Sequence, residues 1–299
     1  MSENVSATAT YENAIEIKNL TKKYDGFTLD NISFCVPKGS IMGFIGQNGA
    51  GKSTTIKAIL NIIKTDGGQI SLLGMDHLKD EAAVKEQIAA VFDECPFHDS
   101  FKAKQLSIMF KGLYENWDEE LFYSYLDRFN LPRNKKIGKF SKGMKMKIQI
   151  ATALSHGAKL LIMDEATTGL DPVVRNEILD IFREYLSDDT NSILMSSHIT
   201  SDLDKIADCV TFIDRGKLLL TGYKDDILES HGLIKCSDAD YQKMAPEDVV
   251  SARKSDFCVD VMVYDRMECK RKYAWANIEK TNLEEIMLFY VNKEKKEWV

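Results

Sequence analysis

The sequence predicts an α/β fold with a helical subdomain inserted into it and a small α+β domain at its C-terminal end. Strand-like and helix-like runs alternate from residue 14 to about residue 222, which is the pattern of a largely parallel sheet covered by helices. The block from 101 to about 156 has helical periodicity and no convincing strand. Beyond about 222 the pattern changes, so we expect a separate accessory domain there.

The expected strands are short apolar runs bounded by turn residues. They cover residues 14–20, 41–46, 69–74, 88–94, 159–165, 192–198, 209–214 and 217–222. Apolar residues recur at helical spacing near 54–63, 173–186 and 201–208. Asp214-Arg215-Gly216 predicts a hairpin between the last two strands. In the accessory domain we expect a strand at 257–266 and a terminal helix with a capping box of Thr281 and Glu284.

The composition excludes several classes of protein. The 299 residues are 44% hydrophobic and 28% charged, as in a packed globular protein. The net charge of −7 makes the chain a poor general binder of nucleic acid, so no such partner is expected. The six cysteines form no Cys-x-x-Cys pair, so we expect buried free thiols in a reducing cytosol instead of a zinc ribbon. No uncharged apolar run approaches the ~18 residues of a transmembrane helix, so a role at a membrane requires another chain to span it.

A phosphate-binding loop stands between an expected strand and an expected helix. IMGFIGQNGAGKSTTIKAIL contains G-x-x-x-x-G-K-S at residues 46–53 in the context that a P-loop requires. Glycines let the backbone wrap a phosphate, and the helix N-terminus directs partial positive charge at it. Lys52 would reach the β- and γ-phosphates, and the Ser53 hydroxyl would bind Mg²⁺. The residues expected to contact the nucleotide are Gly46, Asn48, Gly49, Ala50, Gly51, Lys52, Ser53 and Thr54.

An acidic pair follows another expected strand. Four apolar residues, LLIM, precede Asp164 and Glu165. Such a strand delivers two carboxylates to the carboxyl edge of the sheet, where open α/β sheets bind their ligands. We expect Asp164 to hold Mg²⁺, directly or through water, and Glu165 to polarise the water that attacks the γ-phosphorus.

Together these residues resemble the ATP-binding cassette (ABC) family, and in particular the ATP-binding subunit of a bacterial, exporter-like transporter. The resemblance is carried by FSKGM at 140–144, MDEATTGLDP at 163–172 and SSH at 196–198. It implies a P-loop NTPase domain of the ABC type at 14–222, with its helical subdomain at about 95–156. It leaves 223–299 as a small accessory domain, and it implies that ATP and Mg²⁺ bind.

FSKGM stands where the family has its signature Leu-Ser-Gly-Gly-Gln. The resemblance implies that two cassettes pack head to tail, so that Ser141 and Gly143 of one contact the γ-phosphate held by the other. Lys142 and Met144 depart from the family pattern. Because Ser141 and Gly143 are intact, we expect a working site, and a weakened or asymmetric site stays open as an alternative. Most of the six lysines between 135 and 147 are expected to form a solvated basic face, whereas Lys142 could also steer phosphate.

Four further positions take their expected roles from the resemblance. Tyr24 would stack on adenine, and Asp171 would contact the facing cassette. His198 would contact the γ-phosphate and position Glu165. Glu94 replaces the family's glutamine, which contacts Mg²⁺ and the membrane partner, and a carboxylate there can still bind Mg²⁺.

The function implied by the resemblance is ATP hydrolysis that powers transport, most simply export. The partners are a separate membrane-spanning subunit, contacted through residues 95–140, and a second cassette that is either identical or different. This places the chain in the cytoplasm, on the inner face of the cell membrane. Two alternatives remain open: a regulatory cassette with little hydrolysis of its own, and a soluble ABC ATPase without a transport role. Another P-loop class, such as a small-molecule kinase, is disfavoured by FSKGM and SSH.

Overall fold

The computed structural model describes residues 12–255 and 257–295. Its centre is a six-stranded sheet in the order β10-β9-β3-β8-β7-β6. Neighbouring strands from β9 to β6 are parallel, and β10 pairs antiparallel with β9. The bounds are β3 Ile41–Ile45, β6 Ile88–Phe92, β7 Leu160–Asp164, β8 Ser192–Ser197, β9 Cys209–Asp214 and β10 Lys217–Tyr223. The predicted hairpin is confirmed, since Arg215 and Gly216 both have positive φ, as a two-residue hairpin turn requires.

A second, antiparallel sheet stands beside the central one. Its order is β2-β1-β4-β5, with β1 Asn13–Tyr24, β2 Phe27–Pro37, β4 Gly67–Leu72 and β5 Met75–Asp76. The strands expected at 14–20 and 69–74 therefore exist, but they do not belong to the parallel sheet. The sequence analysis missed β2, which pairs with β1 across a tight turn. Side chains packed between the two sheets form one apolar core that also encloses α1 (Lys52–Ile59).

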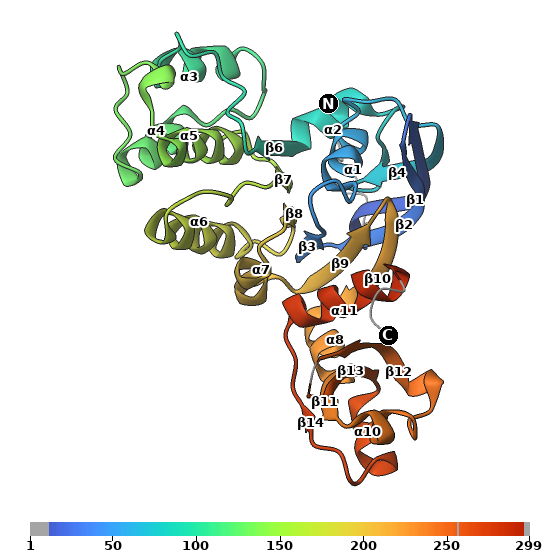
Figure 1. The fold of residues 1–299 in the computed structure, drawn as a ribbon. Helices are drawn as coiled ribbons and strands as arrows, with labels where there is room; N and C mark the ends of the chain where they lie inside the picture. Colours follow the sequence, from blue (N-terminus) through green and yellow to red (C-terminus); the bar gives the residue numbers. More distant parts are fainter. Residues whose placement is uncertain (1–11, 256, 296–299) are drawn as a thin grey trace.

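The helical block lies at one end of the central sheet, beyond β6 (Figure 1). It comprises α3 Ala103–Lys111, α4 Glu119–Arg128, the short η1 Ile137–Lys139 and α5 Lys142–Leu154. Gln149 of α5 fastens the block to the sheet, because its amide accepts from Phe92 N and donates to Phe92 O. The remaining helices around the sheet are α2 Glu81–Gln87, α6 Pro172–Tyr185 and α7 Thr200–Ile206.

Residues from 224 onwards form a unit with a sheet of their own, at the end of the molecule opposite the helical block (Figure 1). Its sheet has the antiparallel order β12-β13-β11-β14. The strands are β11 His231–Cys236, β12 Val249–Lys254, β13 Val259–Tyr264 and β14 Ile278–Glu279; the helical segments are α8 Lys224–Ser230, α9 Asp238–Tyr241, η2 Pro246–Asp248, α10 Arg266–Lys272 and α11 Leu283–Lys295. Apolar residues of α11 belong to the same buried cluster as Leu203 and Ile206 of α7, so the unit is packed onto the rest of the chain.

Two local predictions were wrong. The cap of α11 is shifted by one residue, because Asn282 Oδ1 accepts from Glu285 N–H while the Thr281 hydroxyl donates to the Glu285 carboxylate. The cysteines are all free, but only Cys209, Cys236 and Cys269 are buried, and Cys35 is exposed. Within the described residues no helix is both long and apolar enough to cross a bilayer.

Candidate active site

The loop between β3 and α1 has the backbone shape of a phosphate cradle. Gly51 has φ 116°, a conformation that a side chain disfavours. A Cβ built on Gly51 would stand 3.1 Å from Phe27 Cζ, and one on Gly46 would stand 2.4 Å from the Ile213 carbonyl oxygen. Both glycines are therefore demanded by close packing inside this chain, and the loop can wrap a small anion only because they lack side chains.

The loop encloses a cavity of about 390 Å³. The cavity brings the predicted nucleotide-binding residues together with Glu165, and it adds an aromatic side chain that the sequence analysis missed. Its lining residues are Phe27, Asn48, Gly49, Gly51, Lys52, Ser53, Thr54 and Glu165. Gly46 and Ala50 were also predicted to contact nucleotide, but they lie buried beneath the loop, where the Ala50 carbonyl accepts from Gly216 N–H at 2.8 Å.

Within the described part of the chain, Lys52 is the one cation in the lining of this cavity. Only 5% of it is exposed. Its ammonium donates to the carbonyl oxygens of Gly46 at 2.7 Å and Gln47 at 3.2 Å, and it lies 3.0 Å from Glu165 Oε1. The loop carbonyl groups thus hold the Lys52 ammonium beside the Glu165 carboxylate, which also lines the cavity.

Glu165 is held from several directions, although its φ of 54° is unusual for a residue with a side chain. Its Oε2 accepts from the Thr168 hydroxyl at 2.8 Å and lies 2.5 Å from His198 Nδ1. Its N–H donates to the Ser196 hydroxyl at 3.0 Å, and that hydroxyl donates to Asp164 Oδ1 at 2.7 Å. Ser196 therefore fixes both predicted carboxylates, although the sequence analysis assigned it no role.

The environment keeps Glu165 ionised. Burial by itself raises the pKa of the Glu165 carboxyl, but the Lys52 ammonium, the Thr168 hydroxyl and His198 together outweigh burial and lower that pKa below its ordinary value. An ionised carboxylate beside an ammonium, with its second oxygen oriented by a histidine, is a suitable base for a bound water molecule.

Comparison with known proteins shows the family to which the chain belongs. A model of the family described as "ABC transporter" matches residues 29–168. The bacitracin transport ATP-binding protein BcrA of Bacillus licheniformis is 34% identical over 208 residues, which are 69% of this chain and 68% of that protein. The chain belongs to the ABC transporter family.

Two more relatives and one solved structure agree. The lantibiotic transport ATP-binding protein SrtF of Streptococcus pyogenes is 32% identical over 69% of this chain and 89% of its own. The daunorubicin/doxorubicin resistance ATP-binding protein DrrA of Streptomyces peucetius is 31% identical over 73% of this chain and 68% of its own. A structure titled as the ATP-binding subunit of an ABC transporter superposes with a TM-score of 0.65 at 29% identity, over 72% of this chain and 91% of that one. The chain is thus an ATP-binding ATPase subunit that powers transport.

The signature residues of this ABC subunit stand at helix N-termini, outside the P-loop cavity. Ser141 is the N-cap of α5 and accepts from Met144 N–H at 3.2 Å. Asp171 is the N-cap of α6 and accepts from Val173 and Val174 N–H. A Cβ on Gly143 would make only ordinary contact with Val174, at 3.5 Å. This chain itself therefore does not require a glycine at 143, in contrast to Gly46 and Gly51.

Tyr24 and Glu94 do not line the cavity. Tyr24 is 47% exposed at the end of β1, and the ammonium of Lys22 lies 5.2 Å from the centre of its ring. Phe27, at the start of β2, is the aromatic residue that covers the loop. Glu94 is exposed just beyond β6. These two predicted roles, at adenine and at magnesium, remain predictions.

The site contains a hydroxyl and a carboxylate that could bind Mg²⁺ together with the phosphates of a nucleotide. The described residues contain no group of three or more His, Cys, Asp or Glu side chains placed to hold a metal. Mg²⁺ in nucleotide sites is held by one or two protein oxygens together with phosphate oxygens and water. Ser53 at the start of α1 and Asp164 at the end of β7 fit that requirement.

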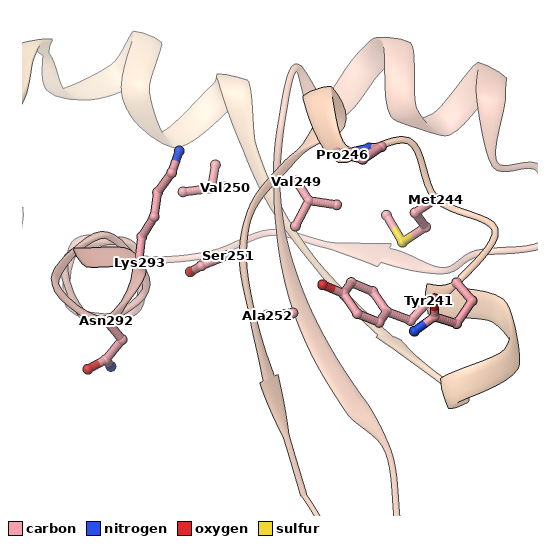
Figure 2. A pocket seen from close by; sticks show the side chains of 10 residues that line it. Tyr241, Met244, Pro246, Val249, Val250, Ser251, Ala252, Asn292 and Lys293 are labelled. Atoms are coloured by element: carbon pink, nitrogen blue, oxygen red, sulfur yellow. The ribbon is translucent and has the colours of Figure 1, made fainter. Parts of the chain in front are cut away.

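A second cavity, of about 820 Å³, lies in the C-terminal unit (Figure 2). Its walls come from the 241–246 segment, from β12 and from α11. Among the residues that the structure describes, Lys293 is the only charged side chain in its lining, and no carboxylate lines it. It therefore offers neither a phosphate cradle nor a magnesium ligand, and the P-loop cavity is the candidate active site.

Proposed function

We propose that this ATPase subunit drives export through a separate membrane-spanning subunit by closing on a second cassette. The observation that carries the proposal is Glu165, an ionised carboxylate opposite Lys52 and oriented by His198. Export is supported by the relatives named for bacitracin and lantibiotic transport and for drug resistance, since outward transport is the direction that would protect a cell. The subunit would work in the cytoplasm, at the inner face of the cell membrane.

The proposed chemistry begins with competition for Lys52. Its ammonium faces Glu165, and a triphosphate in the cradle would offer it a stronger anionic partner. Glu165 Oε1 would then be released to accept the proton of a water molecule, while Thr168 and His198 hold Oε2. This proton transfer accompanies attack of the water on the γ-phosphorus, a reaction that needs mainly positioning and charge neutralisation.

Magnesium would be held by Ser53 and Asp164, with Glu94 as a further carboxylate nearby. When bound, it would neutralise charge on the β- and γ-phosphates. The Ser196 hydroxyl donates to Asp164 Oδ1, which leaves the other carboxylate oxygen for the ion. Hydrogen bonds from a hydroxyl orient a metal-binding carboxylate in this way in other sites.

The second cassette would contribute Ser141, Gly143 and Asp171. The support is that all three stand at helix N-termini and that Ser141 and Asp171 are exposed. A helix N-terminus with a small residue in its first turn favours an anion. The absence of a packing reason for Gly143 within the chain fits a constraint imposed from outside, by the nucleotide on the facing cassette. We propose 14–222 as the cassette and 223–299 as the accessory domain.

The test is Glu165→Gln. This variant keeps the shape of the side chain but removes its charge, so it should bind ATP and turn over at least about tenfold more slowly. It should also accumulate as an ATP-bound dimer, measured by analytical ultracentrifugation. Hydrolysis at the parental rate would refute Glu165 as the base. The alternative of a regulatory cassette predicts that the parent protein, even with its membrane partner, hydrolyses no faster than Glu165→Gln.

A further inference from the structure

Lys142 makes an ion pair inside its own chain that the usual signature glycine cannot make. It stands in the first turn of α5, and its ammonium lies 2.6 Å from Asp93 Oδ1. That oxygen is buried and has no hydrogen bond to any other residue in 12–255 or 257–295. The two side chains are 45% and 41% exposed, so water could reach Asp93 once Lys142 is removed, and little stability would be lost. What removal would break is the link between the start of α5 and the end of β6.

Asp93 is itself fixed to the catalytic edge of the sheet. It follows β6 directly, and its N–H donates to the Asp164 carbonyl oxygen at 3.0 Å. The Lys142 ammonium also lies 3.2 Å from the position that a Cβ on Gly169 would take. Lys142 therefore contacts the residue after β6, which is hydrogen-bonded to Asp164, and the loop that leads to Asp171, while its own backbone belongs to the signature turn.

A neighbouring lysine shows what an ordinary ion pair on this helix looks like. Lys145, one turn along α5, lies 3.3 Å from Asp99, whose side chain is 73% exposed. Its two side chains are 31% and 73% exposed, against 45% and 41% for Lys142 and Asp93, so both pairs are open to solvent. The Lys145–Asp99 pair differs in that it reaches no residue that adjoins Asp164. Exposed pairs of this kind contribute little to stability, so Lys145 provides a matched control for Lys142.

We propose that Lys142 is a positioning residue that couples the two nucleotide sites of the cassette pair. This inference rests on the proposed function. In that pair the signature turn of a cassette faces the nucleotide of its partner, whereas Asp93 and Asp164 of the same cassette lie at its own nucleotide. The Lys142–Asp93 pair holds the signature turn in a fixed position relative to Asp93 and Asp164. Nucleotide bound at the P-loop of a cassette would therefore also orient the signature turn of that cassette for docking.

The experiment uses the full chain in the Glu165→Gln background. MgATP is titrated, and the dimer fraction is measured by analytical ultracentrifugation. The affinity of the monomer is measured separately, with a fluorescent mant-ATP probe at protein concentrations below those that give dimers. The ratio of the ATP concentration at half-dimerisation to the monomer Kd then isolates the docking step from nucleotide binding. Unfolding temperatures identify any variant that is merely unstable.

Lys142→Gln should raise that ratio about three- to tenfold, and Lys142→Arg should restore it. Lys145→Gln should change it less than about twofold. Asp93→Asn should resemble Lys142→Gln, and the double variant should be no worse than either single one, because both changes remove the same interaction.

Two results would refute the inference, and they can be told apart. If the Glu165→Gln parent stays monomeric at saturating MgATP, the proposed cassette pairing is wrong and the inference is lost with it. If the parent dimerises and Lys142→Gln gives the same ratio as Lys145→Gln, only the inference is wrong. Should Lys142→Gln prove unstable, the comparison of Asp93→Asn with Lys142→Arg decides in its place.

Discussion

His198 Nδ1 lies 2.5 Å from Glu165 Oε2, whereas Lys52 lies 3.0 Å from Oε1 of the same carboxylate. The two oxygens of Glu165 thus have different partners. Lys52 is the partner that a triphosphate would take away, and His198 is the one that would remain. Because the exchange leaves Oε2 fixed, Oε1 can be freed for water without losing the orientation of the carboxylate.

His198→Ala should therefore lower kcat more than it weakens ATP binding. We expect kcat to fall about 10- to 100-fold, as for loss of a group that positions a general base, with the ATP Kd changed less than about threefold. Steady-state ATPase assays and equilibrium binding measure the two quantities. His98→Ala is the control, because His98 is exposed and its Nδ1 contacts Ser100 instead of the cavity. An equal fall in kcat in His198→Ala and His98→Ala would contradict the role of His198 in positioning Glu165.

Gly51→Ala should disable the cradle by a packing effect that a matched glycine lacks. Gly51 and Gly157 both have positive φ, but a Cβ on Gly51 would stand 3.1 Å from Phe27 Cζ and one on Gly157 no closer than 3.8 Å to Asn116 Cβ. Gly157→Ala should cost about 1–2 kcal/mol from backbone strain alone, because its φ of 72° lies in the left-handed region, and Gly51→Ala should cost at least as much, because its φ of 116° lies outside it. Gly51→Ala should cost about 1–3 kcal/mol more from overpacking.

Urea unfolding measures that difference, and ATP binding should be lost in Gly51→Ala alone. Retention of ATP affinity in a folded Gly51→Ala protein would show that the loop can open by another route. The same loss in Gly157→Ala, at the far end of α5, would point to a general effect of destabilisation.

Asp188→Asn should reveal a pH-dependent contribution to stability in the loop before β8, where Asp188 pairs with Lys159 just before β7. The Thr190 hydroxyl, the Thr190 N–H and the Lys159 ammonium lower the pKa of the Asp188 carboxyl from 3.8 to about 2. Since the folded state favours the carboxylate, its stabilisation is complete above pH ~4 and is lost as the pH falls towards 2. Asp188 is 48% exposed, so the free energy of unfolding of Asp188→Asn should be lower than that of the parent by less than about 1 kcal/mol.

Urea unfolding at pH 7, 4 and 2.5 measures this difference. The difference in the free energy of unfolding between the parent and Asp188→Asn should become smaller as the pH falls. Asp189→Asn is the control, because the Asp189 carboxylate has no hydrogen bond to the residues that the structure describes. A gap that stays constant over this range would contradict the lowered pKa.

The inner strands β3, β7, β8 and β9 of the central sheet were predictable because they are buried on both faces. Runs such as LLIM before Asp164 are continuous and apolar, and they alternate with amphipathic helices. The antiparallel sheet was not predictable in the same way. β2 carries Asp30 and Asn31 in its middle, and it is defined by pairing with β1, which no local pattern records.

The site was predictable where a motif dictates backbone shape and less so where side chains meet in space. Lys52 and Glu165 lie in separate motifs, and both line the cavity. Phe27 carries no signal in the sequence, because it is an aromatic residue after a turn. Ser196 stands in the SSH motif, but the motif does not show that its hydroxyl contacts both Asp164 and Glu165. Asp93 received no role from the sequence, since its pairing with Lys142 depends on how α5 lies against β6.

The aromatic partner of adenine can be tested by separating base from phosphate. Tyr24 is exposed, whereas Phe27 lines the cavity and packs over Gly51. If Tyr24 stacks on adenine, Tyr24→Ala should weaken ATP about 5- to 100-fold, in line with ~1–3 kcal/mol for stacking on one base. It should leave the affinity for inorganic triphosphate unchanged, and Tyr24→Phe should bind ATP normally.

Phe27→Ala should weaken the binding of both ATP and triphosphate, because it removes the side chain that supports the loop. Isothermal titration calorimetry measures the affinities of Tyr24→Ala and of Phe27→Ala for ATP and for triphosphate. Equal losses for both ligands in Tyr24→Ala would transfer the stacking role away from Tyr24, and a loss for ATP alone in Phe27→Ala would assign it to Phe27.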